Sequence, residues 1–407
     1  MPLLFGRDFT KADLQRRLGD FRQVIGVELL ELQDGPERGM RVLEFKSGSG
    51  LCFTVLVDRS MDFGRFDFKG IPFAWQSGTG FRHPNLIDPM SEGGTGFMRG
   101  FSGLLCTCGL DHIRQPDRGR ADHFDLPLRQ EMVYPMHGRG AFQPSRLNGY
   151  GLRWHGDEAV LWCEGTLHQV QVMGEHLSLT RRIEVAVGSS QVHFTDTVQN
   201  HGFSRTPHML LYHINLGWPL LDAGARFSAP ITGTLAANMP QQVQQVGYRV
   251  QSAPQPRFVQ QVFDHAFKAD AQGRVPTALV NDTLALGFAY EFDATAFRCL
   301  QQWQAFGEGL YGFGIEPATA HWGSREDAQN RGEVIELQHD EIRTYRSTLS
   351  VLDGAQAIAA HEQRVEAITP LIDDGFPHRS QQPTGGPLVK QLPTRRVASL
   401  DQLPPSD

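Results

Sequence analysis

Two polar side chains share one face of an otherwise apolar segment. In HMLLYHINLGWP (208–219), alternation along an extended strand turns His213 and Asn215 to one side, and Tyr212 and Ile214 to the other. Burying an imidazole and a carboxamide costs free energy unless both find hydrogen-bond partners. The pair is therefore either a hydrogen-bonded pair in the core or part of a cleft wall. In the second case His213 could act as a general acid, because imidazole titrates near neutral pH.

A carboxylate follows two residues without side chains near the end of the strand-rich part. In GLYGFGIEPATAHW (309–322), alternation places Glu316 on the same strand face as Gly312 and Gly314. Pro317 ends the strand hydrogen bonding directly after it. A carboxylate in such a recess predicts a general base with a shifted pKa. The alternative is a glutamate at a strand edge that pairs with an arginine.

Other candidate residues occur in less regular segments. His137 in YPMHGRGAF is predicted to lie in a loop between strands, where binding residues concentrate. Arg99 in GFMRGFSGL is flanked by glycines that would let the backbone approach a ligand, and a guanidinium can donate two hydrogen bonds. Asp62 in VDRSMDFGRF is either a site residue or a member of a turn ion pair. His208 precedes His213 by five residues and should face the opposite side of a regular strand, which argues against a metal site formed by these two.

The elements that must position these residues are predicted to be strands. From about residue 24 to 352, apolar residues alternate in short runs that are separated by Gly-containing turns. Helical patterns are limited to 11–18, with Thr10 as N-cap, and to 354–368. Well over a dozen short strands and few helices predict an all-β fold, a large antiparallel β-sandwich. The Gly-rich stretch 77–118 is predicted to be a long functional loop.

Domain organisation and composition narrow the class of protein. We expect one domain over 1–369 and a Pro-rich tail over 370–407 without a core of its own. The net charge of −7 and the absence of a polybasic run argue against nucleic-acid and membrane partners. No apolar stretch is long enough for a membrane span or a signal peptide. Five scattered cysteines do not form a disulfide framework, so we expect a cytoplasmic protein in which Cys106 and Cys108 are a buried pair.

The candidate segments together resemble a known family. YHINLG resembles the NHxYFNL strand of aldose 1-epimerases, which are galactose mutarotase-like proteins, MHGRGAF resembles their HGG loop, and GIEP resembles the strand that carries their catalytic glutamate. The order Arg99, His137, His213, Glu316 is also the order of the family. The run from DRSMDF through FMRGFSGLLCTCG to GIEPATAH looks like a bacterial branch of this superfamily, a domain of unknown function labelled as an aldose 1-epimerase family. The resemblance covers roughly residues 20–352.

The resemblance implies a supersandwich of large antiparallel sheets with a sugar cleft on a concave face. It implies that Glu316 takes the proton of the anomeric hydroxyl and that His213 protonates the ring oxygen. The reaction needs an acid and a base on opposite sides of the hemiacetal, and no cofactor. Sugar hydroxyls would be held by the predicted binding residues Arg99, His137, Asn215, Asp62 and His208. The apolar face of the sugar ring would pack on one of the tryptophans Trp75, Trp218, Trp303 and Trp322.

The sequence therefore predicts an isomerase of the aldose 1-epimerase type that acts on a small-molecule carbohydrate and needs no metal. The first alternative is a carbohydrate-binding module of the same fold without turnover. The second is a metal-dependent sugar isomerase that uses His137, His208, His213 or His321 with Glu316. The oligomeric state stays open, with a homodimer among the states allowed. Several glycines are expected to provide the clearance that the sugar needs: Gly96, Gly100, Gly103, Gly138, Gly140, Gly312 and Gly314.

Overall fold

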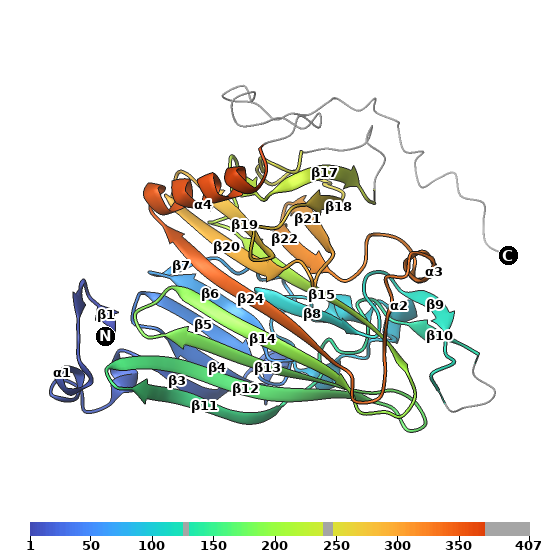
Figure 1. Cartoon of the computed structure of the whole chain (residues 1–407), viewed down its shortest axis with the longest axis horizontal. Helices are drawn as coiled ribbons and strands as arrows, with labels where there is room; N and C mark the ends of the chain where they lie inside the picture. Colours follow the sequence, from blue (N-terminus) through green and yellow to red (C-terminus); the bar gives the residue numbers. More distant parts are fainter. Residues whose placement is uncertain (125–129, 239–246, 371–407) are drawn as a thin grey trace.

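The computed structural model describes residues 1–124, 130–238 and 247–370, and nearly half of these residues form antiparallel strands (Figure 1). The largest sheet has eight strands. In spatial order they are β11 (Arg146–His155), β12 (Glu158–Val170), β13 (His176–Ala186), β14 (Gln191–Asn200), β24 (Ile342–Asp353), β20 (Leu286–Asp293), β19 (Arg274–Asn281) and β16 (Arg226–Ser228).

A second sheet of seven strands packs against the first. Its order is β17 (Ile231–Ala236), β18 (Gln261–Phe267), β21 (Cys299–Gly307), β22 (Leu310–Ala318), β15 (Thr206–Gly217) and β23 (Ile335–Leu337), and β8 (Leu105–Leu110) also pairs with β15. A five-stranded sheet follows the chain order: β3 (Gly26–Glu31), β4 (Arg41–Lys46), β5 (Leu51–Leu56), β6 (Asp62–Phe68) and β7 (Ile71–Pro72). Two hairpins complete the strands: β1 (Leu3–Leu4) with β2 (Arg7–Asp8), and β9 (Asp117–Arg120) with β10 (Glu131–Tyr134).

Phenylalanine side chains hold the sheets together. Phe66 of β6 packs edge-on against Phe288 of β20, with ring centroids 5.6 Å apart, which joins the five-stranded sheet to the eight-stranded one. Phe227 of β16 packs against Phe313 of β22 at 5.5 Å, which joins the eight-stranded sheet to the seven-stranded one. Large aromatic rings contribute much of the apolar area that such a core buries. The predicted all-β sandwich is confirmed.

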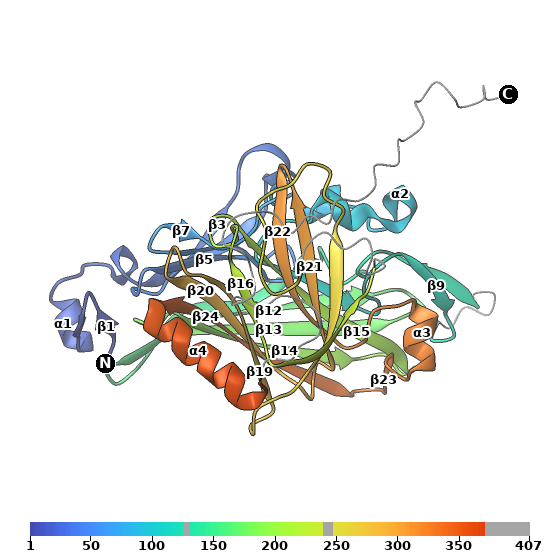
Figure 2. The same cartoon turned by 90° about the horizontal axis from the view of Figure 1, so that it is seen from above.

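The helices lie at the periphery of the sheets. The helices are α1 (Lys11–Gln15), α2 (Ser91–Gly94), α3 (Arg325–Asn330) and α4 (Ala355–Ile368). Thr10 caps α1 as predicted by accepting from the Asp13 amide at 3.0 Å, although the helix ends earlier than residue 18. The helix predicted over 354–368 is α4, which packs on β19, β20 and β24 and is seen from above in Figure 2. No helix in the described ranges is both long and apolar enough to cross a membrane.

The stretch 77–118 is only partly the loop that we predicted. It contains β8, whose six residues are all buried and pair with β15. Because both faces of β8 are covered, its sequence lacks the alternation that marks a half-exposed strand. Cys106 and Cys108 lie in this strand and are buried, as predicted. Of the predicted tail 370–407, only Pro370 belongs to the described residues.

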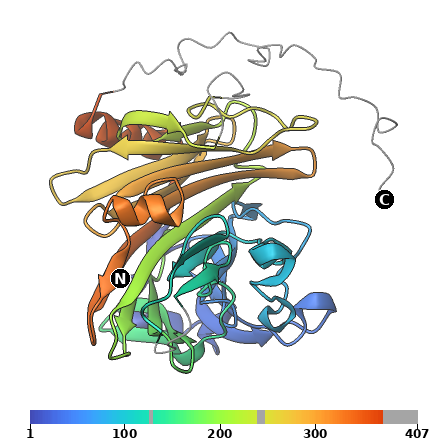
Figure 3. The ribbon, with the colours of Figure 1, turned by 90° about the vertical axis from the view of Figure 1, so that its right-hand side faces the viewer.

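Strand β15 is the element that positions the candidate site. All twelve of its residues are buried. Figure 3 shows this light-green strand running diagonally, with the orange strands on one side and the cyan and teal loops on the other. The strand pairs with β8 and with β22, so its side chains meet residues from distant parts of the chain.

Candidate active site

A row of polar side chains crosses the seven-stranded sheet. Strand register pairs Asp264 of β18 with Gln301 of β21, and Gln301 with Glu316 of β22. The register of β15 on β22 places His213 opposite Glu316. Because residues opposite each other in neighbouring strands point to the same face of a sheet, the four side chains lie in one line.

This face lines a pocket of about 170 Å³. The sheet supplies part of the lining, and the segment before β8, the residue before β18 and the loops after β8, β10 and β22 supply the rest. The lining residues are Phe97, Met98, Phe101, Arg114, Gln115, Met136, His137, His213, Gln260, Val262, Trp303, Glu316 and Trp322.

His213 and Glu316 form a close buried pair in this pocket. Nε2 of His213 lies 3.2 Å from Oε1 of Glu316, and each residue is 4% exposed. Nδ1 of His213 and Oε1 of Glu316 have no hydrogen-bond partner in the described structure. An unsatisfied buried polar atom costs about 1–3 kcal/mol, so these two atoms do not stabilise the fold and are free to interact with a ligand. Glu316 forms no ion pair with an arginine of the described residues, and the strand-edge alternative is therefore wrong.

Burial shifts the pKa values of the pair in opposite directions. It raises the pKa of the Glu316 carboxyl to about 8, and the charge of Arg114 opposes this rise to a smaller extent. It lowers the pKa of His213 to about 3, against a smaller opposing effect of Asn215. Near neutral pH the pair therefore holds one proton, which resides on the carboxyl group.

This shift predicts that Glu316→Gln becomes increasingly stabilising as the pH rises. An unfolded glutamate releases its proton near pH 4.5, whereas folded Glu316 keeps its proton until about pH 8. Between these values the folded state binds more protons, so the free energy of unfolding of the wild type falls with rising pH. Urea unfolding measures the free energy of unfolding of both proteins. The excess of Glu316→Gln over the wild type should grow by about 1–4 kcal/mol from pH 5 to pH 8. A gain that is constant over this range, or one equal to that of the exposed control Glu184→Gln, would contradict the shift.

His137 lies next to the pair and is held by Arg114. The Arg114 amide donates to Nδ1 of His137 at 3.2 Å, and the His137 amide donates to the Arg114 carbonyl at 2.7 Å. Because Nδ1 accepts, a neutral imidazole carries its proton on Nε2. Burial, together with the nearby His213, holds the pKa of His137 well below its usual value, so the ring is neutral. His137 therefore presents a fixed Nε2–H donor to the pocket that it lines.

Arg114 and Asp264 belong to the site region, although the sequence did not indicate them. Arg114 is 5% exposed, and its guanidinium donates to the Gln301 side chain and to the Ala320 carbonyl. Asp264 accepts from the Trp322 amide at 2.8 Å and contacts His321, which holds Trp322 in the pocket wall. A usable signal for Arg114 was its position four residues after the apolar run that forms β8, where a loop must leave the sheet.

The structure corrects the predicted position of Arg99. Its side chain is 60% exposed and forms an ion pair with Glu92, whereas the neighbouring Met98 lines the pocket. Arg99 ends a short 3₁₀ helix (Gly96–Arg99) in which Gly96 and Phe97 are the buried residues. An arginine that can reach water keeps its charge hydrated there, because burying it would need a partner.

Three more predicted binding residues do not line the pocket. Asp62 is buried among the side chains of Thr107, Arg59 and Arg181. Nδ1 of His208 donates to the Leu110 carbonyl and its Nε2 accepts from Tyr345, both at 2.7 Å. The amide of Asn215 donates to the Gly103 and His213 carbonyls, both at 3.0 Å. Asp62 and His208 therefore have protein partners that account for their burial, whereas Oδ1 of Asn215 has no hydrogen-bond partner in the described structure.

The metal-isomerase alternative required several of these histidines together. His208 is held away from the pocket, and Nδ1 of His321 contacts Asp264 at 3.2 Å. Within the described residues, no three His, Cys, Asp or Glu side chains are grouped so that they could hold a metal ion. The ligand set of that alternative is therefore not brought together.

The glycines near the site make room for protein atoms and not for a sugar. A Cβ at Gly314 would lie 2.9 Å from Oε1 of Glu316 and 3.2 Å from Cε1 of His213. A Cβ at Gly312 would lie 2.9 Å from the Trp303 ring. Gly138 and Gly140 approach backbone atoms of Gly109 in the same way. The predicted clearance for a ligand is wrong, and close packing of the chain against itself is the reason for these glycines.

We expect Gly314→Ala to displace the pair and to destabilise the fold by about 1–3 kcal/mol, the usual cost of overpacking. The added methyl would also meet Cβ of Trp303 at 2.9 Å, so the side chains on both sides must move. Chemical denaturation measures the loss. Gly233→Ala on β17 is the control, because its added Cβ meets nothing closer than 3.9 Å. Equal stabilities of the two variants would refute the tight packing.

Two of the four candidate tryptophans line the pocket. Trp303 and Trp322 do so, and Nε1 of Trp303 donates to Oε1 of Gln260 at 2.9 Å. Trp75 packs behind Trp303, with ring centroids 5.6 Å apart. Trp218 is exposed and is not among the lining residues.

The structure is similar to several solved structures. A "putative aldose 1-epimerase" from Klebsiella pneumoniae has a TM-score of 0.75 and 23% sequence identity, over 86% of this chain and 91% of that chain. A galactose mutarotase-like protein from Clostridium acetobutylicum has a TM-score of 0.56 and 13% identity, over 81% and 99%. A galactose 1-epimerase from Lactobacillus acidophilus has a TM-score of 0.51 and 11% identity, over 81% and 99%. These similarities establish a galactose mutarotase-like fold.

Sequence comparison adds the family. A search of curated proteins finds no match to the chain. Residues 37–351 match the model of one family, which is described as a domain of unknown function, DUF4432. This match covers most of the chain and includes every residue of the pocket. The chain therefore belongs to the DUF4432 family.

Proposed function

We propose that this protein is a cofactor-independent isomerase of the aldose 1-epimerase type, which interconverts the anomers of a free sugar. The observation that carries the proposal is the contact of 3.2 Å between His213 and Glu316 inside a pocket, with unpaired polar atoms on both side chains. The galactose mutarotase-like fold and the resemblance of the strands that carry these residues support it.

The chemistry needs a proton acceptor at the anomeric hydroxyl and a proton donor at the ring oxygen. Both oxygens are bonded to the same carbon, so an acid and a base that lie side by side can each reach one of them. The adjacent positions of Glu316 and His213 fit this requirement better than the opposite sides expected from the sequence. General acid and base groups of this kind contribute about 10²–10⁴-fold each.

The reaction starts with one proton on the pair. Its transfer from Oε1 of Glu316 to Nε2 of His213, across 3.2 Å, produces a carboxylate base and an imidazolium acid. Glu316 then takes the anomeric proton while His213 protonates the ring oxygen, the bond between carbon 1 and the ring oxygen breaks, and a carbonyl forms. Rotation of the carbonyl group and closure from its other face give the second anomer, and the two protons return along the same routes. The charge of Arg114 stabilises the carboxylate in this cycle.

The pocket also contains groups that would hold the sugar. The Nε2–H of His137 is a fixed donor, and Gln115 and Gln260 at the mouth carry amides. The rings of Trp303 and Trp322 offer surfaces for the apolar face of a sugar ring.

Saturation-transfer NMR on a panel of free aldoses would test the proposal. The purified protein should accelerate anomer exchange, and added chelator should leave the rate unchanged. Loss of the acceleration with chelator would favour a metal-dependent isomerase. Sugar binding without acceleration would favour a carbohydrate-binding module, and either result would refute the proposal.

A further inference from the structure

Arg114 is a buried cation in the pocket lining, and no carboxylate of the described residues forms an ion pair with it. Burial lowers the pKa of its guanidinium to about 10, so the group keeps its charge at neutral pH. Its φ of 74° is in a region that costs residues other than glycine free energy. Buried charges are normally paired, so this one calls for a counter-ion that the described residues do not supply.

Two carboxylates that act on the pKa of Arg114 from a distance are bound to other groups. Both oxygens of Asp264 lie 3.2 Å from Nδ1 of His321. Oε2 of Glu333 accepts from the His321 amide at 3.2 Å and from Nε of Arg331 at 2.9 Å. Neither carboxylate is therefore the missing partner of the guanidinium.

One nitrogen of this guanidinium has hydrogen-bond donors to spare. Nε and Nη2 of Arg114 bond to the Gln301 side chain and to the Ala320 carbonyl. Nη1 carries two further N–H groups, and these donate to none of the described residues. Because Arg114 lines the same pocket as His137, whose Nε2–H is a fixed donor, the pocket offers several donors to an acceptor group of a ligand.

Among the described residues that line the pocket, Arg114 is the only one that is charged at neutral pH. The other titratable lining groups are Glu316, His137 and His213. Glu316 keeps its proton until about pH 8. Aromatic rings pack directly on both histidines, with centroids 4.6 and 4.7 Å away, and burial keeps both imidazoles neutral. The empty pocket therefore holds a single positive charge.

A carboxylate is the ligand group that matches this charge. It carries one negative charge and accepts hydrogen bonds without donating any, so it complements one guanidinium. A phosphate monoester carries a charge of about −1.5 to −2 near neutral pH and would leave negative charge unbalanced in the pocket. A free aldose keeps its aldehyde at carbon 1, so an aldohexose that bears a carboxylate at its other end is a hexuronic acid.

We propose that the substrate is a hexuronic acid whose carboxylate accepts hydrogen bonds from Nη1 of Arg114. This inference rests on the proposed function and names the substrate class of the same site. Gln301, to which Arg114 is bonded, lies opposite Glu316 on the next strand, and neighbouring strands are about 4.8 Å apart. In the six-membered ring form the carboxyl carbon is three bonds from carbon 1, so one sugar can contact both Glu316 and Arg114.

Sugars that differ only at carbon 6 provide the test. One set consists of D-glucuronate, D-glucuronamide, D-glucose and D-glucose 6-phosphate, and the galacto and manno sets are built in the same way. For each sugar, kcat/KM for anomer exchange and Kd from NMR titration are measured. In at least one set the uronate should exceed the other three sugars by about ten-fold or more in kcat/KM and in affinity, because the amide keeps the shape of the carboxylate and removes its charge. The absence of this advantage in every set, or a stronger preference for the 6-phosphate, would overturn the inference.

Removing the guanidinium should remove the preference. Arg114→Met takes away the charge and the Nη1 donors, so the ratio of kcat/KM between uronate and hexose should fall to within about three-fold of parity. The ratio is decisive because the effect of Arg114 on Glu316 acts on both sugars alike. If this variant fails to fold, the comparison of uronate with uronamide on the wild type decides.

A matched control removes a guanidinium elsewhere. Arg182→Met changes an arginine of β13 that pairs with Glu184 and does not line the pocket, and it should keep the ratio of the wild type. A ratio that is unchanged in Arg114→Met, or that falls equally in both variants, would contradict the inference.

The two proposals fail in different ways. Anomer exchange that is fast on neutral sugars without preference for the uronate would remove only the substrate class. Absence of exchange on every sugar would remove the proposed function, and the Kd values of uronate and uronamide would still decide whether the pocket selects a carboxylate.

Discussion

Replacing Glu316 with glutamine should lower the rate of anomer interconversion by about 10²–10⁴-fold. The amide has nearly the shape of the carboxyl group but can neither accept the anomeric proton nor pass a proton to His213 across the contact of 3.2 Å. Saturation-transfer NMR gives the rate, and circular dichroism checks that the fold is kept. The variant should remain folded, because it replaces a buried ionisable group by a neutral one.

A matched control separates this effect from a general effect of losing a carboxylate. Glu184→Gln changes a side chain that pairs with Arg182 at the surface of the eight-stranded sheet, and it should leave the rate within about two-fold. Full activity of Glu316→Gln, or an equal loss in both variants, would remove Glu316 from the proposed mechanism. His213→Gln should show a loss similar to that of Glu316→Gln, because the two side chains share one proton.

Replacing Arg181 with methionine should lower the free energy of unfolding by about 3–5 kcal/mol. Arg181 is completely buried on β13, and its guanidinium binds Asp196 at 2.8 and 2.5 Å and Thr107 at 2.9 Å. It also lies 3.2 Å from Asp62. Methionine fills much of the volume but leaves two buried carboxylates without their shared cation. Urea unfolding followed by fluorescence measures the loss.

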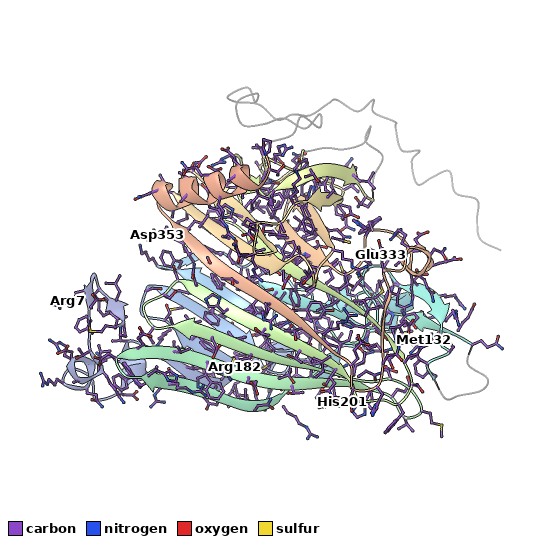
Figure 4. The ribbon with its side chains drawn as sticks, in the orientation of Figure 1. Arg7, Met132, Arg182, His201, Glu333 and Asp353 are labelled. Atoms are coloured by element: carbon purple, nitrogen blue, oxygen red, sulfur yellow. The ribbon has the colours of Figure 1, made fainter. Side chains whose placement is uncertain are left out.

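The next residue of the same strand provides the control. Arg182, which is labelled in Figure 4, points to the opposite face. Its side chain is 30% exposed there and pairs with Glu184 and Glu164. Surface pairs of this kind are worth about 0–1 kcal/mol, so Arg182→Met should be nearly neutral. Similar losses for the two variants would show that the buried network adds no special stability. A much larger loss of unfolding free energy for Arg181→Met than for Arg182→Met would support a structural role for Asp62 in the buried network.

The local pattern of apolar and polar residues was sufficient to predict much of the secondary structure. Alternating burial along β12 follows the alternation of its sequence, and α4 lies within one residue of the predicted helix. These elements are half-exposed, so their periodicity is visible in the sequence. Strand β8 was missed inside the predicted loop, because a strand that is buried on both faces loses its periodicity.

The sequence also indicated His213, Glu316 and His137, which line one pocket. His213 and Glu316 could be recognised because burying a polar side chain in an apolar strand costs free energy. His137 could be recognised because it is followed by glycines in a predicted loop. The same reasoning selected Arg99 and did not indicate Arg114, since glycine neighbours look alike whether they make room for a ligand or for the chain itself. Only the tertiary structure shows that these glycines make room for neighbouring backbone and side-chain atoms of the chain itself.

The sequence by itself determined which strand face His213, Asn215 and Glu316 occupy, because side chains alternate along a strand with a fixed period of two. Only the tertiary structure decided which strands are neighbours and in what register. The pairing of β15 with β22 brings His213 to within 3.2 Å of Glu316, and the register of β18 and β21 adds Asp264 and Gln301 to the same row. Such pairings depend on contacts between residues that are far apart in the chain, and no local pattern encodes them.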